Sequence, residues 1–380
     1  MTQENHAIEI GIICALPLEA RAVKALFKVH PAYEGDSEAA SFGGNTNVNT
    51  SKARADRNAY TTGEIGRHHV ALVHMPGMGE IPAAAVAADL KHSFEEIRLV
   101  LLVGICGGVP GGEGGGGKEE IPRKVMLGDV IVGKQVIQYG FGRQYPDGFK
   151  RKDDPENSLS RQSPEIRAFV AKLEASREEL EGKTWAYLRS VFKHKLDEGM
   201  RDELMPPTYW HKHHNLDDCV SKKCSNDGEI CEDPRKASCE QLKCSEGQWF
   251  MEPRQKPDIH FGTIASGNSV MRSGEERDQL AAKENIIAFD MEGAGIWDYL
   301  PCIIVKGVCD YADSHKNKKW QNYAAMTAAA CTKGILELWP SKHSGRNPED
   351  KASFASIAAS LNLQEANARR AGGGCTKSFL

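Results

Sequence analysis

The 380-residue sequence lacks the features that mark several classes of protein. No stretch approaches the run of about 18 apolar residues that a membrane-spanning helix needs, so we expect no membrane partner. Lys and Arg (48) do not outnumber Asp and Glu (52), and the net charge of −4 argues against a nucleic-acid partner. Residues 1–5 are polar and precede no apolar stretch, so no secretory signal is expected. These absences predict a cytoplasmic protein.

Apolar residues make up 40% of the chain and charged residues 26%, a balance that allows a packed core. Short apolar runs alternate with segments of helical periodicity, which predicts an α/β fold with a mostly parallel sheet flanked by helices. Strands are expected at residues 8–14, 70–75, 99–103, 129–137, 259–265, 286–290 and 302–308. Helices are expected at about residues 17–26, 81–93, 164–196 and 321–339.

The pattern changes between about residues 153 and 257, where no run is as apolar as the strands before it. This segment is interpreted as an insertion without a core of its own, helical and charged at first and rich in Cys and His later. We therefore expect one domain over residues 7–340, interrupted by this insertion. Residues 341–380 form a tail, whose end at Gly372–Gly374 is expected to be disordered.

The insertion carries five cysteines separated by four, six, seven and four residues, with His211, His213 and His214 upstream. None of these spacings is the two-residue spacing of a common zinc knuckle. Three states remain open: thiols without a partner, which we favour, disulfides, which are less expected inside a cell, and a structural zinc site. The candidate zinc ligands are Cys219, Cys224, Cys239 and Cys244.

Polar or glycine residues follow the ends of several expected strands. In parallel α/β sheets, ligands bind at the carboxyl ends of the strands, so these positions indicate one shared site. Taken singly, Glu292 also fits a helix N-terminus and Asp310 a turn, so only the coincidence points to a site. The positions are Glu19, Gly77–Gly79, Gly104–Gly108, Ser266–Asn268, Glu292 and Asp310.

Two further motifs allow two interpretations each. Gly104–Gly108 lacks the Lys-Ser/Thr ending of an ATPase loop and the glycine spacing of a dinucleotide site, so it is either a ligand cradle or a tight turn. The basic run His315–Lys319 is either a solvated loop or, if it folds over the Asp310 crevice, a phosphate-binding segment.

The assembled motifs resemble the purine nucleoside phosphorylase and nucleosidase superfamily. The resemblance covers about residues 8–140 and 258–339, and the order of the pieces is more specific than any one of them. The insertion and residues 310–320 look most like the fungal, ATP nucleosidase-like version, which often serves as an effector on immune-receptor-like proteins. The matching stretches are IGIICAL (10–16), PGMG (76–79), VGICGG (103–108), LGDVIV (127–132), IASGN (264–268), MEGA (291–294) and VCDYAD (308–313).

The resemblance implies a single three-layer α/β domain around a twisted mixed sheet. It also implies a homo-oligomer, with a dimer as the first expectation, in which a neighbour completes the site. In this family Glu292 would bind both sugar hydroxyls, Asp310 would donate a proton to purine N7, and Glu19 would orient and deprotonate the attacking water. No cofactor is expected for this chemistry.

The same comparison implies a set of substrate contacts. Val270 and Met271 would line the base, and Met291 would pack under the sugar. The remaining implied contacts are Ser266, Gly79, Gly104, Cys106, Gly107 and Trp320.

Glu19 and Ile105 favour hydrolysis over phosphorolysis, because phosphorylases of this type carry Ser or Thr in place of Ile105 to hold phosphate. Phosphorolysis stays open, since Lys306 stands where many members have Arg. The expected phosphate-binding residues are Lys316, Lys318, Lys319, His315 and Lys306, with Arg143 from a neighbouring subunit.

These charges favour an adenine nucleotide nucleosidase that prefers ATP and releases adenine. The alternatives are a purine nucleoside phosphorylase, a nucleosidase for methylthioadenosine or adenosine, and a non-catalytic nucleotide-sensing or oligomerisation module.

Overall fold

The computed structural model describes residues 8–28, 52–111, 124–193, 202–213, 219, 231–232, 234, 237–244, 249–251, 256–316 and 318–340. Cys224 and the tail over 341–380, for which expectations were stated, lie outside these residues. The chain divides into two compact units, Met1–Leu338 and Trp339–Leu380, and every helix and strand below belongs to the first.

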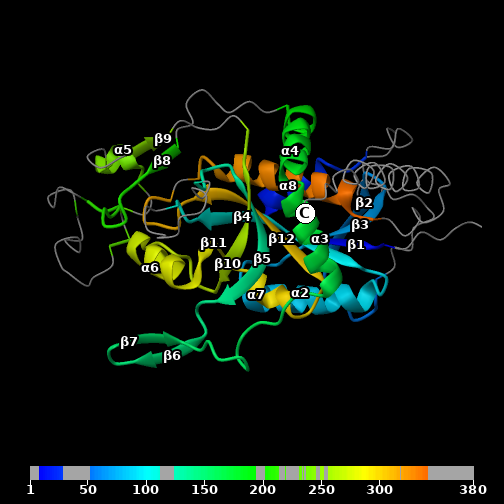
Figure 1. Cartoon of the computed structure of the whole chain (residues 1–380), viewed down its shortest axis with the longest axis horizontal. Coiled ribbons are helices and arrows are strands. Elements are labelled where there is room, and N and C mark those ends of the chain that lie inside the picture. The colour runs from blue at the N-terminus through cyan, green and yellow to red at the C-terminus, as the bar shows by residue number, and fades with distance from the viewer. Residues whose placement is uncertain are drawn as a thin grey trace, which may run out of the picture. The chain divides into compact units, whose positions relative to one another are not determined.

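The centre of this unit is an eight-stranded mixed sheet (Figure 1). Its strand order is β11-β10-β5-β12-β4-β1-β3-β2. The strands are β1 (Ile10–Cys14), β2 (Ala59–Ile65), β3 (His68–His74), β4 (Leu99–Gly108), β5 (Val130–Gln138), β10 (Ile259–Ser266), β11 (Ile286–Asp290) and β12 (Cys302–Asp310).

Most neighbouring strands are parallel, but β2–β3 and β5–β12 are antiparallel. A further antiparallel contact joins β11 to β4 at Gly107 and Gly108. This contact closes β11, β10, β5, β12 and β4 into a ring, so the ends of β4, β11 and β12 are brought together.

Helices cover both faces of the sheet, which explains why β1, β4 and β12 read as continuous apolar runs. In Figure 1, α8 (Gln321–Leu338) lies on one side and α2 (Glu80–Ser93) with α7 (Gly293–Trp297) on the other. Helix α8 approaches β12 closely at Gly307, where a Cβ would overlap the carbonyl of Ala324. None of the described helices has the length and apolar character of a membrane span.

The expected α/β class is confirmed, and the expected strands are present with shifted ends. Strand β4 continues to Gly108, through the motif interpreted as a ligand cradle or a tight turn, and β12 ends at Asp310, two residues later than expected. Both extensions arise because the two strands pair along this stretch. Strand β2 and the hairpin of β6 (Gly142–Tyr145) and β7 (Gly148–Arg151) were not expected.

The first part of the expected insertion contributes to the main core. Helix α3 (Pro164–Ala175) begins where Ser163 caps the N–H of Ile166, and α4 (Arg177–Val191) follows. Leu173, Leu180 and Leu188 are fully buried, and Leu188 belongs to the large core cluster. Helix α4 packs against α8. The charged face of this segment therefore hides a buried apolar stripe that the composition alone does not reveal.

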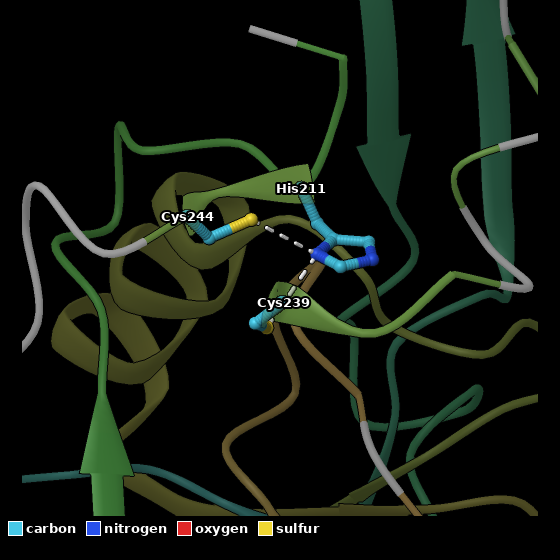
Figure 2. A group of neighbouring side chains, drawn as sticks. All are labelled: His211, Cys239 and Cys244. Atoms are coloured by element: carbon cyan, nitrogen blue, oxygen red, sulfur yellow. Dashed lines mark hydrogen bonds between the residues drawn. The ribbon is translucent and has the colours of Figure 1, made fainter. Parts of the chain in front are cut away.

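The later part contains β8 (Asp202–Leu204), α5 (Cys239–Leu242) and β9 (Trp249–Met251), with β8 and β9 antiparallel. Cys239 and Cys244 lie beside His211 (Figure 2). Cys219 instead lies beside Cys231. The expected grouping of Cys219 with Cys239 and Cys244 is therefore wrong, because the fold places Cys219 with Cys231 and keeps Cys239 with Cys244.

Replacing Leu188 by Ala tests whether α4 is part of the core. The substitution leaves a cavity in a fully buried cluster, so we expect a loss of about 2–5 kcal/mol in the free energy of unfolding, measured by urea denaturation. Ser190→Ala, on the exposed face of the same helix, is the control and is expected to change it by no more than about 0.5 kcal/mol. Equal effects of the two variants would contradict the assignment.

Candidate active site

A cavity of about 690 Å³ lies at the carboxyl ends of β1, β4, β11 and β12. This size is ordinary for a small-molecule site. Its lining comes from segments far apart in the chain, including the insertion. The lining residues are Ala15, Leu16, Glu19, Met78, Ile105, Cys106, Gly107, Ala237, Ser238, Ser269, Val270, Met271, Arg272, Phe289, Asp290, Met291, Glu292, Cys309, Asp310, Lys316, Lys318 and Gln321.

Glu19 is held by three backbone donors. It lies in the first turn of α1 (Pro17–Lys24), where Oε2 accepts the N–H groups of Ala15 (2.9 Å) and Leu16 (2.8 Å). Its Oε1 accepts the N–H of Ile105 in β4 at 2.9 Å. Burial raises the pKa of Glu19, although the charge of Lys306 opposes this. Glu19 is thus a fixed carboxylate that can take up a proton more readily than an exposed one.

Gly104 is required for this arrangement. A Cβ at this position would overlap the Glu19 carboxylate. The side chain of Glu19 therefore occupies the space that the side chain of any larger residue at position 104 would need. Gly104 shapes the site in this way although it is not among the described lining residues.

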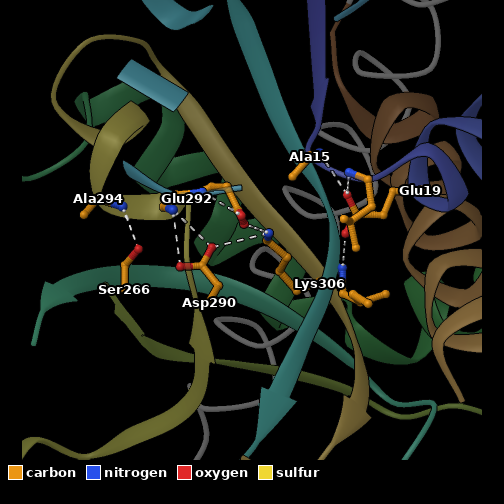
Figure 3. Close-up of polar contacts among 11 residues, drawn as sticks. Ala15, Glu19, Ser266, Asp290, Glu292, Ala294 and Lys306 are labelled. Carbon is orange, nitrogen blue, oxygen red and sulfur yellow. Dashed lines mark hydrogen bonds and ion pairs between the residues drawn. The ribbon is translucent and has the colours of Figure 1, made fainter. Parts of the chain in front are cut away.

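Lys306 lies between the carboxylates of Asp290 and Glu292 (Figure 3). Its Nζ is 2.9 Å from Glu292 Oε2 and 3.5 Å from Asp290 Oδ2, and the side chain is 1% exposed. Burial alone would lower the pKa of Lys306, but the carboxylates of Glu292, Asp290 and Glu19 outweigh burial and raise it. Lys306 was expected to bind phosphate. Its ammonium is instead committed to these carboxylates.

Asp290 was not singled out in the sequence. It ends β11, and both of its carboxylate oxygens accept the N–H of Gly293, at 3.2 and 3.1 Å. Burial raises the pKa of Asp290 and Lys306 opposes this. The available signal was its place at a strand end two residues before Glu292.

Two of the expected substrate contacts support Glu292 and its helix. The N–H of Gly79 points to Glu292 Oε1 at 3.4 Å, and Ser266 Oγ accepts the N–H of Ala294 in α7 at 2.9 Å (Figure 3). Neither Gly79 nor Ser266 is among the described lining residues. Both residues position the Glu292 segment from behind the cavity wall.

Asp310 ends β12 and faces the cavity beside Gly107. Its Oδ1 accepts the N–H of Ala312 at 2.9 Å and lies 2.7 Å from Lys316 Nζ. A Cβ on Gly107 would come to 3.0 Å from the same oxygen. The three carboxylates expected to act together, those of Glu19, Glu292 and Asp310, therefore line one cavity.

Cationic side chains line the same cavity. Lys316 and Lys318 were expected there, and Arg272 was missed. Lys318 and Arg272 are exposed, whereas Lys316 is half-buried in its ion pair with Asp310. The signal for Arg272 was its place directly after Val270 and Met271, which also line the cavity as expected, as do Met291 and Cys106.

Four expected contacts lie elsewhere among the described residues. Trp320 is 2% exposed and packs edge-on against Tyr323 in the core, at 5.7 Å between ring centroids. His315 stacks on Tyr209, and burial lowers the pKa of His315 to about 4, so it is neutral near pH 7. Lys319 is exposed outside the lining, and Arg143 is exposed on the β6–β7 hairpin.

Residues 9–337 match the family model described as the phosphorylase superfamily. The chain belongs to this superfamily. It is 30% identical over 339 residues to a nucleotide-binding leucine-rich repeat (NLR)-like protein of Hyaloscypha variabilis, a match that covers 86% of this chain and 29% of that relative. The chain thus spans under a third of that relative's length.

Two nucleosidases match over nearly their whole length at lower identity. A 5′-methylthioadenosine/S-adenosylhomocysteine nucleosidase of Mycobacterium bovis is 19% identical over 346 residues, 88% of this chain and 98% of that one. The Helicobacter pylori 5′-methylthioadenosine/S-adenosylhomocysteine nucleosidase structure gives a TM-score of 0.51 at 14% identity, covering 88% of this chain and 100% of that one. The structural match confirms the fold.

Replacing Lys306 by Met tests the buried ion pairs. Removing the cation leaves Asp290 and Glu292 buried without their partner, so we expect a loss of about 3–5 kcal/mol in the free energy of unfolding. Burial raises the pKa of Asp290 and Lys306 opposes this, so without the lysine Asp290 binds a proton more readily in the folded chain. The loss should therefore be smaller at about pH 5 than at about pH 8.

Lys134→Met is the matched control for this measurement. Lys134 is also ion-paired, to Glu174 at 2.8 Å, but it is 46% exposed, so the expected loss is at most about 1 kcal/mol. Urea denaturation at both pH values makes the comparison. A Lys306→Met loss as small as that of the control would refute the role given to Lys306.

Proposed function

We propose that the protein is a purine nucleotide nucleosidase that hydrolyses the N-glycosidic bond of an adenine nucleotide, preferentially ATP, to adenine and ribose 5-triphosphate. The observation that carries the proposal is one cavity lined both by the carboxylates of Glu19, Glu292 and Asp310 and by the cations Arg272, Lys316 and Lys318. The carboxylates suit the chemistry at the sugar–base bond, and the cations suit a phosphate chain.

Cleavage of an N-glycosidic bond passes through a sugar with oxocarbenium character. The reaction needs a proton for the departing base, negative charge near the sugar and a water molecule delivered to C1′. We assign the proton to Asp310, the sugar hydroxyls to Glu292 and the water to Glu19. Burial raises the pKa of Glu19, which strengthens it as a base once it is ionised.

Hydrolysis is favoured over phosphorolysis by the surroundings of Glu19. A bound phosphate would need donors near the sugar. There Ile105 offers only its backbone N–H, which Glu19 already occupies at 2.9 Å. The Lys306 ammonium is likewise committed to Glu292 and Asp290. These two donors are therefore already in use, which favours water as the nucleophile.

The charge on the substrate is the finer part of the proposal. Lys318 and Arg272 are exposed beside the cavity, and their charges suit the phosphates of a nucleotide. Lys316 is bound to Asp310, so it would have to exchange this carboxylate for a phosphate to join them. An uncharged nucleoside would leave these cations without a partner, which is why we place methylthioadenosine and adenosine second.

The chain's relation to an NLR-like protein supports a role as a fungal defence effector that depletes ATP.

We also infer a homo-oligomer in which the β6–β7 hairpin contacts a neighbour. This hairpin carries Arg143 together with Tyr145 and Phe149, which are 43% and 49% exposed. Such exposed aromatic side chains are typical of an interface.

Incubation with ATP, ADP, AMP, adenosine and methylthioadenosine, with and without phosphate, tests the reaction by chromatography of the products. We expect free adenine, fastest from ATP and without any need for phosphate. Asp310→Asn is expected to lower the rate by about 10²- to 10⁴-fold because the base would leave unprotonated. Asp278→Asn, in α6 (Gly274–Glu284) and outside the cavity lining, is the control.

Each alternative has its own result in this assay. A requirement for phosphate would indicate a phosphorylase, and faster cleavage of methylthioadenosine would indicate a nucleosidase for uncharged substrates. ATP binding without release of adenine would indicate a sensing module. Unchanged turnover in Asp310→Asn would remove Asp310 from the mechanism.

Charge selection is tested separately with Lys318→Ala and Arg272→Ala. Loss of a cation at the phosphates should raise KM for ATP by about tenfold, the equivalent of about 1.4 kcal/mol, while KM for adenosine stays the same. Lys283→Ala, a 63% exposed lysine of α6 away from the cavity, is the control. An equal rise in KM for ATP and for adenosine would show that Lys318 and Arg272 do not bind the phosphates.

A further inference from the structure

His211 has a defined hydrogen-bonding pattern. Its Nε2 lies 3.0 Å from the carbonyl oxygen of Pro234 and 3.1 Å from that of Ala237. A carbonyl oxygen can only accept, so Nε2 must carry the proton of the neutral ring. Nδ1 then presents a lone pair. Histidines that bind metals are typically held in this way, with the second nitrogen donating to a backbone carbonyl.

Two thiols converge on that lone pair. Nδ1 of His211 lies 3.5 Å from Cys244 Sγ and 3.7 Å from Cys239 Sγ (Figure 2). A tetrahedral zinc ion, with bonds of about 2.3 Å to sulfur and about 2.05 Å to nitrogen, places its N and S ligands about 3.6 Å apart. Both nitrogen–sulfur separations therefore match those of a zinc ligand set, and all three ligand atoms lie within 4.8 Å of one another.

A second set lies in the same segment. His213, Cys219 and Cys231 bring their ligand atoms within 4.8 Å of one another. The sulfurs of Cys219 and Cys231 are 3.8 Å apart, which equals the edge of about 3.8 Å expected between two zinc-bound sulfurs. His211 and His213 are two residues apart, so one short stretch supplies a histidine to each set.

We propose that this segment binds two zinc ions, one at His211, Cys239 and Cys244 and one at His213, Cys219 and Cys231. Imidazole and thiolate are the donors that zinc prefers in proteins. Each ion displaces the two thiol protons of its set, which pass to solvent. The described residues give three ligands to each ion, and a fourth position completes the tetrahedron.

The first site lies next to the cavity. Ala237 and Ser238, directly before Cys239, line the cavity wall. The backbone N–H of His211 donates to Ser314 Oγ at 2.9 Å, and the His211 ring meets that of His315, directly before Lys316, edge-on. Zinc would therefore fix one wall of the cavity. This consequence for substrate binding rests on the proposed function, whereas the metal sites themselves do not.

Metal analysis of the full chain, purified under reducing conditions with zinc present, tests the proposal by elemental mass spectrometry. We expect about two zinc ions per chain in the wild type and about one in Cys244→Ser and in Cys231→Ser, because each variant loses one site. Cys331→Ser, a buried cysteine of α8 that belongs to neither set, is the control and should keep both ions.

Cobalt gives a second readout that does not depend on activity. Co²⁺ added to the chelator-treated protein should produce thiolate-to-metal charge-transfer absorption, reduced by about half in each single-site variant. Wild-type protein without zinc, a spectrum unchanged in Cys244→Ser, or disulfides among these cysteines in peptide mass spectrometry would overturn the proposal. Because the wild-type metal count is decisive, a variant that fails to fold leaves the test intact. Adenine release is scored separately.

Discussion

The buried ion pairs of Lys306 with Asp290 and Glu292 are the constraint on which the site depends. A charge in the interior is tolerated only when it is paired, so β12, which carries the lysine, and the β11–α7 connection, which carries both acids, have one compatible arrangement. The Glu19 carboxylate, on α1, also stabilises the positive charge of Lys306 and so helps to raise its pKa. Three separate parts of the chain are thereby held around one point.

This constraint helps to explain why both acidic and basic groups line the cavity. The ion pairs hold Glu292 and Asp290 in its lining, while the cations Arg272 and Lys318 come from segments that follow β10 and β12. The antiparallel contact between β11 and β4 brings the ends of these strands together. Acidic and basic groups that are distant in sequence therefore line one cavity.

The sequence indicated much of the fold and part of the site. Glu19, Glu292 and Asp310 were identified because strand ends can be read from apolar runs, and the carboxyl ends of strands share one edge. The burial of Lys306 and Trp320 could not be read in this way. Whether such a side chain turns toward ligand or core depends on contacts with other parts of the chain, here Glu292 for Lys306 and Gly128 for Trp320. Asp290 and Arg272 were missed although their places beside Glu292 and Met271 offered a signal.

The continuation of β4 through Gly104 to Gly108 has a consequence for the thermodynamics of ligand binding. A glycine-rich stretch in a loop would lose conformational freedom when it closes on a ligand, and that entropy would weaken affinity. Here the same glycines are already ordered by pairing with β12 and β11. A ligand therefore meets a preorganised floor, and more of its contact energy remains available for affinity.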